Sequence, residues 1–244
     1  MTNKWLKVAL MVTAIATGTS INIDAETVLY VPQDDRPVSL QYTVDTAREA
    51  GMTVLTPPQH LISGKTYQGQ ADQIMAWVEQ NAGRADVMVL STDTLIYGGL
   101  VDSRKHNIPL STLQNRLKRI EGLKARNKNV RIYGFGTVMR SPRASGGGTE
   151  PAYYAEYGPT IFQIAALQDK LDSGSLTQEE TQKMMSLQAS VPVEYLQDWF
   201  DRRQKNMKIN KELIDETRSG VFDYFALGHD DTSQLSQSAL EGRY

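Results

Sequence analysis

The sequence predicts an α/β protein built on a mostly parallel sheet with flanking helices. Short apolar runs rich in branched and aromatic residues, typical of buried strands, alternate with segments of helical periodicity from residue 27 onwards. Three of these runs, at 28–31, 87–90 and 224–227, are followed within a few residues by aspartates. Strand–helix alternation with right-handed crossovers gives a parallel sheet. Because five strands cannot close an eight-stranded barrel, we expect an open sheet or part of a larger barrel-like or doubly wound fold.

The first half of the chain contributes four predicted strands and three predicted helices. A helix capped by Ser39 is expected to run to about residue 50, where Gly51 ends it. Pro109 marks the start of another helix, whose apolar residues recur at helical spacing. The predicted strands cover 28–31, 52–55, 87–90 and 130–138, and the predicted helices cover 39–50, 71–78 and 109–124.

The regular alternation stops after residue 138, where a loop rich in glycine and tyrosine occupies 139–158. A helical insertion near 160–218 follows, and a last strand at 224–227 returns to the sheet. The insertion is predicted to hold a helix at 160–172, a capping-box helix begun by Thr177 and Glu180, and a long helix from Pro192 to Arg218. The buried stripe of that long helix is predicted to consist of Leu196, Phe200, Met207 and Ile214.

Composition narrows the class of protein and its compartment. The 244 residues carry a net charge of -2, and no stripe of lysine and arginine interleaves with aromatics, so we expect no nucleic-acid partner. Residues 1–25 have the layout of an export signal, with Lys4 and Lys7 before a short apolar run and small residues after it. That run is too short for a stable membrane span. We therefore expect a secreted or extracytoplasmic protein with a single α/β domain at 26–244; the alternative is an N-terminal amphipathic helix of a cytosolic protein.

Two charged segments follow predicted strands and are candidates for a site. Asp34, Asp35 and Arg36 come directly after the first strand, although acidic residues there also suit the first turn of a helix. Asp93 follows the third strand and is succeeded by Tyr97, a pair of glycines that permits close approach of the main chain to a ligand, and Arg104.

Two later segments add further candidates. The loop at 139–158 carries Arg140, Glu150 and Tyr153, a composition that suits a lid over a polar ligand. His229, Asp230 and Asp231 follow the last strand and offer metal ligands or a histidine oriented by a carboxylate. The two other histidines of the chain, His60 and His106, lie in polar segments and are predicted to be surface residues.

The candidate motifs together resemble the bacterial domain-of-unknown-function family 4127. The resemblance lies in the segments 31–38, 91–104 and 227–231, whose order and spacing fit over almost all of the chain from residue 28. Family members usually carry a small apolar residue or leucine where Gln33 stands here. They also continue well past the end of this chain, so the resemblance implies an N-terminal portion that lacks part of the site. The family name conveys no activity.

The chemistry of the candidate residues favours an exported hydrolase that acts on a carbohydrate, for instance a glycoside hydrolase. Glycosidic hydrolysis needs two carboxylates, one as acid and one as nucleophile or base, and Asp35, Asp93 and Asp231 are the predicted catalytic residues, with Asp93 and Asp231 as the pair. No cofactor is required. The substrate-binding residues would be Asp34, Arg36, Tyr97, Arg104, Arg140, Glu150, Tyr153 and Asp230.

Two alternatives remain open for a small-molecule or oligosaccharide substrate. In the first, His229 joins Asp35, Asp93 and Asp231 around a divalent metal ion that activates water. In the second, the protein binds a glycan without cleaving it, and the carboxylates only accept hydrogen bonds from sugar hydroxyls.

Overall fold

The computed structural model describes residues 25–144, 147–230 and 233–243, and its centre is an open, five-stranded, all-parallel sheet. This confirms the predicted fold class; the sheet does not close into a barrel. The strand order is β2-β1-β3-β4-β5, a doubly wound order whose direction reverses between β1 and β3. The strands are β1 (Thr27–Val31), β2 (Thr53–Leu55), β3 (Val87–Ser91), β4 (Arg131–Val138) and β5 (Tyr224–His229).

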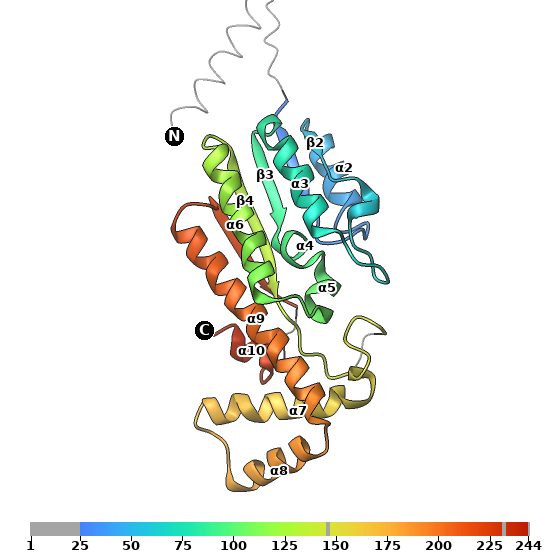
Figure 1. Cartoon of the computed structure of the whole chain (residues 1–244), viewed down its shortest axis with the longest axis vertical. Coiled ribbons are helices and arrows are strands. Elements are labelled where there is room, and N and C mark those ends of the chain that lie inside the picture. Colours follow the sequence, from blue (N-terminus) through green and yellow to red (C-terminus); the bar gives the residue numbers. More distant parts are fainter. Residues whose placement is uncertain (1–24, 145–146, 231–232, 244) are drawn as a thin grey trace, which may run out of the picture.

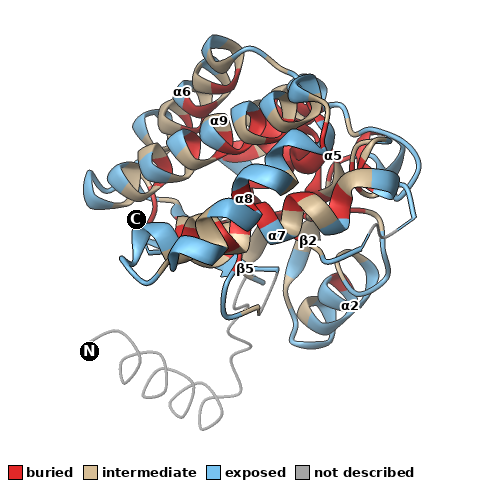
Figure 2. Cartoon of the chain, turned by 90° about the horizontal axis from the view of Figure 1, so that it is seen from below, coloured by how far each residue is buried: buried red, intermediate tan, exposed pale blue. Residues whose placement is uncertain are grey.

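Helices cover the two faces of the sheet unequally. Three long helices lie side by side on one face, and α2 lies on the opposite face, largely exposed (Figures 1 and 2). Val44 is the one buried residue of α2. The α-helices are α2 (Gln41–Glu49), α3 (Ala71–Asn81), α4 (Thr92–Tyr97), α5 (Leu100–Lys105), α6 (Leu110–Arg126), α7 (Tyr154–Asp172), α8 (Gln178–Ala189), α9 (Val193–Arg218) and α10 (Gln237–Glu241), and two 3-10 turns lie at η1 (Gln59–Leu61) and η2 (Ala82–Arg84).

The main core lies between the sheet and α3, α6 and α9. Alternate residues of β4, such as Ile132 and Val138, are buried toward these helices. Leu29 and Met88 from the central strands meet Ile74 of α3 in the same core. Each such aliphatic side chain contributes about 1.5–3 kcal/mol on burial, so this face carries most of the stability of the fold.

The structure confirms the predicted start of α8 but not the predicted start of α2. Thr177 accepts a hydrogen bond from the backbone N–H of Glu180 and completes the predicted capping box. Ser39, in contrast, caps nothing: α2 begins after Leu40, and Ser39 belongs to a turn in which its N–H donates to the carbonyl of Arg36. The carbonyl of Ser39 instead accepts a hydrogen bond from the Tyr30 hydroxyl, which fixes the turn on the sheet.

The predicted apolar stripe of α9 is only partly correct: Leu196 and Phe200 pack against a buried cluster, but the stripe is not the buried face of the helix. Leu196, Phe200, Met207 and Ile214 are only partly buried, and the buried face is offset from them around the helix. That face contains Trp199, Arg202, Arg203, Asn206, Ile209 and Leu213. Its polar members are tolerated because each finds partners inside the protein: Arg202 donates to the carbonyl of His106, and Arg203 pairs with Glu241.

The helical insertion forms a second, smaller core beyond the carboxyl ends of the strands, at the bottom of Figure 1. Tyr154 and Trp199 are its largest buried side chains, with ring centroids 4.6 Å apart. Helix α7 begins at Tyr154, ahead of the predicted start at residue 160, because Tyr154 is buried and anchored by a hydrogen bond to the carbonyl of Pro142. Within the described ranges no helix is both long and apolar enough to cross a bilayer.

Candidate functional site

A cavity of about 400 Å³ opens at the carboxyl ends of the strands, beside the point where the strand order reverses. Ligands of open α/β sheets bind in the crevice at this position, because the loops on either side of the reversal diverge. We call it the switch-point cavity. It is lined by Gln33, Asp34, Arg36, Ser63, Gly64, Lys65, Leu100, Val101, Arg104, Thr137, Arg140, Thr149 and Asp230.

The turn after β3 fixes one wall of the cavity. Ser91 ends the strand and caps α4, whose six residues are all buried. Gly98 then takes a φ of +109° at the end of α4, a conformation that favours glycine. The predicted close approach of the main chain at this glycine pair is present, but its partner is another part of the chain. Gly98 lies so close to Gly69 that a Cβ added to Gly69 would be 2.0 Å from the Gly98 carbonyl oxygen. The segment around residues 63–69 is thereby held against α4 and α5.

Asp93 is buried directly behind the cavity wall. Its Oδ2 accepts hydrogen bonds from Gln33 Nε2 at 2.8 Å and from Thr137 Oγ1 at 2.9 Å, and both donors line the cavity. Burial raises the pKa of Asp93 to about 6, against the opposing effects of these hydrogen bonds and of the Arg104 charge. A carboxyl group with this pKa can hold or release a proton near neutral pH, as a general acid must.

Three arginines converge on the cavity, and each has an acidic partner. Arg36 binds Asp34 at 2.7 Å, Arg104 pairs with Asp230, and Arg140 pairs with the buried Glu150. Burial lowers the pKa of Arg104, and the neighbouring charge of Arg140 lowers it further. Two guanidinium groups held close together in a partly desolvated site favour the presence of an anionic group beside them.

Lys65 adds a fourth cation to the cavity. In the part of the chain that the structure describes, its ammonium group forms no hydrogen bond or ion pair, and the residue is exposed at the cavity rim. Among the described lining residues four cations stand against the carboxylates of Asp34 and Asp230; Glu150 pairs with Arg140 from behind, which leaves Lys65 as the additional cation. This balance favours a ligand that carries negative charge.

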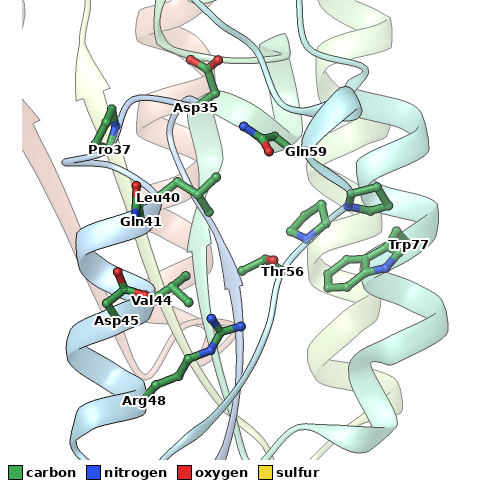
Figure 3. A pocket seen from close by; sticks show the side chains of 12 residues that line it. Asp35, Pro37, Leu40, Gln41, Val44, Asp45, Arg48, Thr56, Gln59 and Trp77 are labelled. Carbon is green, nitrogen blue, oxygen red and sulfur yellow. The ribbon is translucent and has the colours of Figure 1, made fainter.

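The structure brings seven of the predicted site residues together, Asp93 behind the cavity wall among them, and separates others. Asp34, Arg36, Arg104, Arg140 and Asp230 line the cavity, and Glu150 supports Arg140. Asp35 lies instead at the end of a hollow between α2, the 56–59 segment and Trp77 of α3, which we call the α2 groove (Figure 3). Its carboxylate accepts a hydrogen bond from the Tyr67 hydroxyl. Asp231 lies outside the described residues.

Three other predicted residues lie away from the cavity. Tyr97 is buried in the core, Tyr153 stacks on Tyr195 and donates a hydrogen bond to Asp198, and His229 lies against Gly242 beside α9. Among the described residues no three His, Asp or Glu side chains are grouped to hold a metal ion. His229 and Asp35 therefore do not share a site with Asp93 in this part of the chain.

The prediction that His106 lies at the surface is wrong. Its ring is buried and stacks on Tyr97, with centroids 4.9 Å apart. Nδ1 accepts a hydrogen bond from the backbone N–H of Ile108, so Nε2 carries the proton and donates to Asn206 Oδ1 at 2.8 Å. Burial lowers the pKa of His106 to about 4, which keeps the ring neutral.

Sequence reasoning missed Gln33, Lys65 and Thr137. Gln33 and Thr137 are the hydrogen-bond donors to Asp93, and Lys65 is the unpaired cation of the described cavity lining. Thr137 could have been predicted from its position next to the end of a predicted strand. Polar side chains at such positions reach the carboxyl edge of a sheet. Lys65 lies between elements and carried no such signal.

The fold and the cavity define a doubly wound α/β protein with a polar, charged site at its switch point. Within that class, the chain belongs to a family described as "Protein of unknown function (DUF4127)", whose profile matches residues 28–244. The resemblance seen in the sequence motifs is thus confirmed. No functionally curated protein and no solved structure is significantly similar to the chain.

Proposed function

We propose that the protein is a hydrolase that cleaves a carbohydrate in the switch-point cavity, with Asp93 as the source of the catalytic proton. The observation that carries this proposal is the placement of Asp93 behind Gln33 and Thr137, two hydrogen-bond donors that face the cavity. Hydrolysis of a glycosidic bond requires protonation of the leaving oxygen and a second carboxylate that activates water or attacks the sugar.

Thr137 connects Asp93 to the substrate. When Asp93 is protonated, it donates to Thr137 Oγ1, and the hydroxyl proton of Thr137 becomes free to pass to an oxygen in the cavity. The glycosidic C–O bond breaks as this proton reaches the leaving oxygen. A water molecule adds to the anomeric carbon and gives its proton to the second carboxylate, so that the net reaction consumes one water.

The second carboxylate belongs to the pair that follows β5. Asp230 lines the cavity beside Arg104, and Asp231 is the residue that the sequence favours for this role. Lys65, which has no ion-pair partner among the described residues, would bind an acidic group of the substrate together with the neighbouring arginines of the cavity.

The test is a screen of acidic and neutral polysaccharides for release of reducing ends, followed by variants of the active chain. Asp93→Asn is expected to lower kcat by about 10²–10⁴-fold, the usual contribution of general acid catalysis. Thr137→Val should cause a large loss and Thr137→Ser a small one, because only serine keeps the hydroxyl. Asp201→Asn, at an exposed position of α9 away from both hollows, serves as the control. Full turnover by Asp93→Asn on every cleaved glycan would refute the proposal.

We also propose that the protein is exported. Support comes from the sequence of residues 1–25, which has a basic start, a short apolar run and small residues. Fractionation of cells that express the full chain, with N-terminal sequencing of the product, tests this. The expected product lies outside the cytoplasm and has lost its first residues; an intact chain in the cytoplasm would contradict export.

A further inference from the structure

The α2 groove is a second hollow, separated from the switch-point cavity by the turn after β1. It has a volume of about 680 Å³ and runs along α2, with Asp35 at one end and Arg48 at the other (Figure 3). The proposed hydrolase chemistry makes no use of it.

Two walls face each other across the groove, and both present apolar side chains. One wall consists of apolar rings: Pro57, Pro58 and the partly buried indole of Trp77. The other wall is α2, from which Leu40, Val44 and Arg48 point toward the rings, with Gln41 and Asp45 at its edge (Figure 3). Apolar walls edged by polar side chains suit a ligand whose faces are apolar and whose edges carry hydroxyl groups.

Asp35 accepts a hydrogen bond from the Tyr67 hydroxyl, whereas four other polar side chains of the groove have no such partner among the described residues. Within the described ranges, the side chains of Gln41, Asp45, Arg48 and Gln59 form no hydrogen bond and no ion pair. Together they offer amide, carboxylate and guanidinium groups, which supply both donors and acceptors. Adjacent hydroxyls of a sugar ring, each a donor and an acceptor, match such a set.

The groove and the cavity share one turn as their common wall. Asp34 and Arg36 face the cavity, whereas Asp35 and Pro37 face the groove. The backbone N–H of Asp35 donates to the carbonyl of Ser63 at 2.9 Å, which holds this turn in place between the two hollows. A chain molecule whose end occupies the cavity would reach the groove by crossing this turn beside the Tyr67 hydroxyl, which donates a hydrogen bond to the Asp35 carboxylate.

We propose that the α2 groove binds the continuation of an oligosaccharide whose terminal, acidic residue occupies the switch-point cavity. The inference rests on the proposed function for the occupant of the cavity. It adds that the substrate is a chain of several sugar residues and that recognition depends on its length.

Calorimetry with galacturonic acid and its linear hexamer tests this, because the two share the carboxylate and differ in length. The hexamer is expected to bind the full chain about tenfold more tightly than the monomer or better, as two added hydrogen bonds to charged or amide groups would give. The double variant Arg48→Ala, Gln59→Ala should bind the hexamer no better than the monomer. Tyr42→Ala, at an exposed site of α2 outside the groove, is the matched control and should change neither affinity.

Different results would overturn the groove proposal and the proposed hydrolase function. Equal affinities for monomer and hexamer, absence of hexamer binding, or a length preference that survives the double variant would overturn the groove proposal. The groove proposal would also be overturned if the protein bound a proline-rich peptide but not the hexamer, and if the double variant lost the binding of that peptide. Unchanged turnover by Asp93→Asn would instead overturn the proposed hydrolase and leave a length-dependent affinity as evidence for the groove.

Discussion

Asp93→Asn should make the protein more stable at neutral and alkaline pH. In the folded protein burial raises the pKa of Asp93 to about 6, from an ordinary value of 3.8. Because a change of one in pKa corresponds to about 1.4 kcal/mol, ionised Asp93 costs the folded state about 3 kcal/mol. Asparagine has nearly the same shape, carries no charge and retains an acceptor oxygen for Gln33 and Thr137. The amide oxygen of asparagine accepts weaker hydrogen bonds than a carboxylate, which offsets part of the stability gained by removing the charge. We therefore expect about 1–3 kcal/mol of added stability above pH 7.

The sign of the pH dependence follows from proton linkage. Below about pH 4 the carboxyl group is protonated in both the folded and the unfolded chain, and the cost vanishes. Between pH 4 and 6 the unfolded chain releases its proton first, so the stability of the wild type falls as pH rises. Above pH 6 the loss is complete. The stabilisation by Asp93→Asn should therefore grow from near zero to its full value across this window.

Urea denaturation at several pH values between 4 and 8 measures this difference. Asp201→Asn, at an exposed position of α9, is the control and should change stability by less than about 0.5 kcal/mol at every pH. A stability difference for Asp93→Asn that does not vary with pH, or a destabilisation at pH 8, would show that Asp93 is not a buried carboxyl group with a raised pKa.

Two further predictions concern the surroundings of the cavity. The His106 ring should remain neutral in NMR spectra between pH 5 and 8, because burial lowers its pKa to about 4; stability should fall as pH drops from 6.5 toward 4, and a titration near pH 6.5 would contradict its burial. Gly69→Ala should destabilise the fold by about 1–3 kcal/mol, measured by urea denaturation, since the new Cβ would meet the Gly98 carbonyl oxygen. Gly83→Ala, with open space around it, is the matched control, and equal effects of the two changes would refute the argument.

The fold and the location of the site follow from local patterns. Strands such as 87–90 appear as apolar runs whatever their partners, and parallel strands place their carboxyl ends at one edge. The sequence therefore indicated that Asp93, Asp34 and Asp230 would gather there, as they do. The sequence did not indicate which of the two adjacent aspartates faces the cavity. The contact of Asp35 with Ser63 decides this, and Asp35 and Ser63 are far apart in the chain.

Burial of polar side chains was the part that local patterns did not reveal. His106 looks like a surface residue among its neighbours, yet Asn206, a hundred residues away, supplies the partner that makes burial possible. Arg203 likewise occupies the buried face of α9 because Glu241 and two backbone carbonyl groups satisfy its guanidinium group. Helical periodicity counts apolar residues and so misplaces a buried face that is partly polar.

The long insertion between β4 and β5 has a consequence for the order of folding. Val138 ends β4 and Tyr224 begins β5, so more than eighty residues separate two strands that pair in the sheet. Contacts of such large sequence separation form late, because the loop that they close is costly in entropy. Asp230 directly follows β5 and takes its place only when β5 pairs with β4. Before that step, Arg104 lacks the negative charge of Asp230. The cavity wall should thus be completed last, and pulsed hydrogen exchange during refolding should protect the amides of β5 after those of β3.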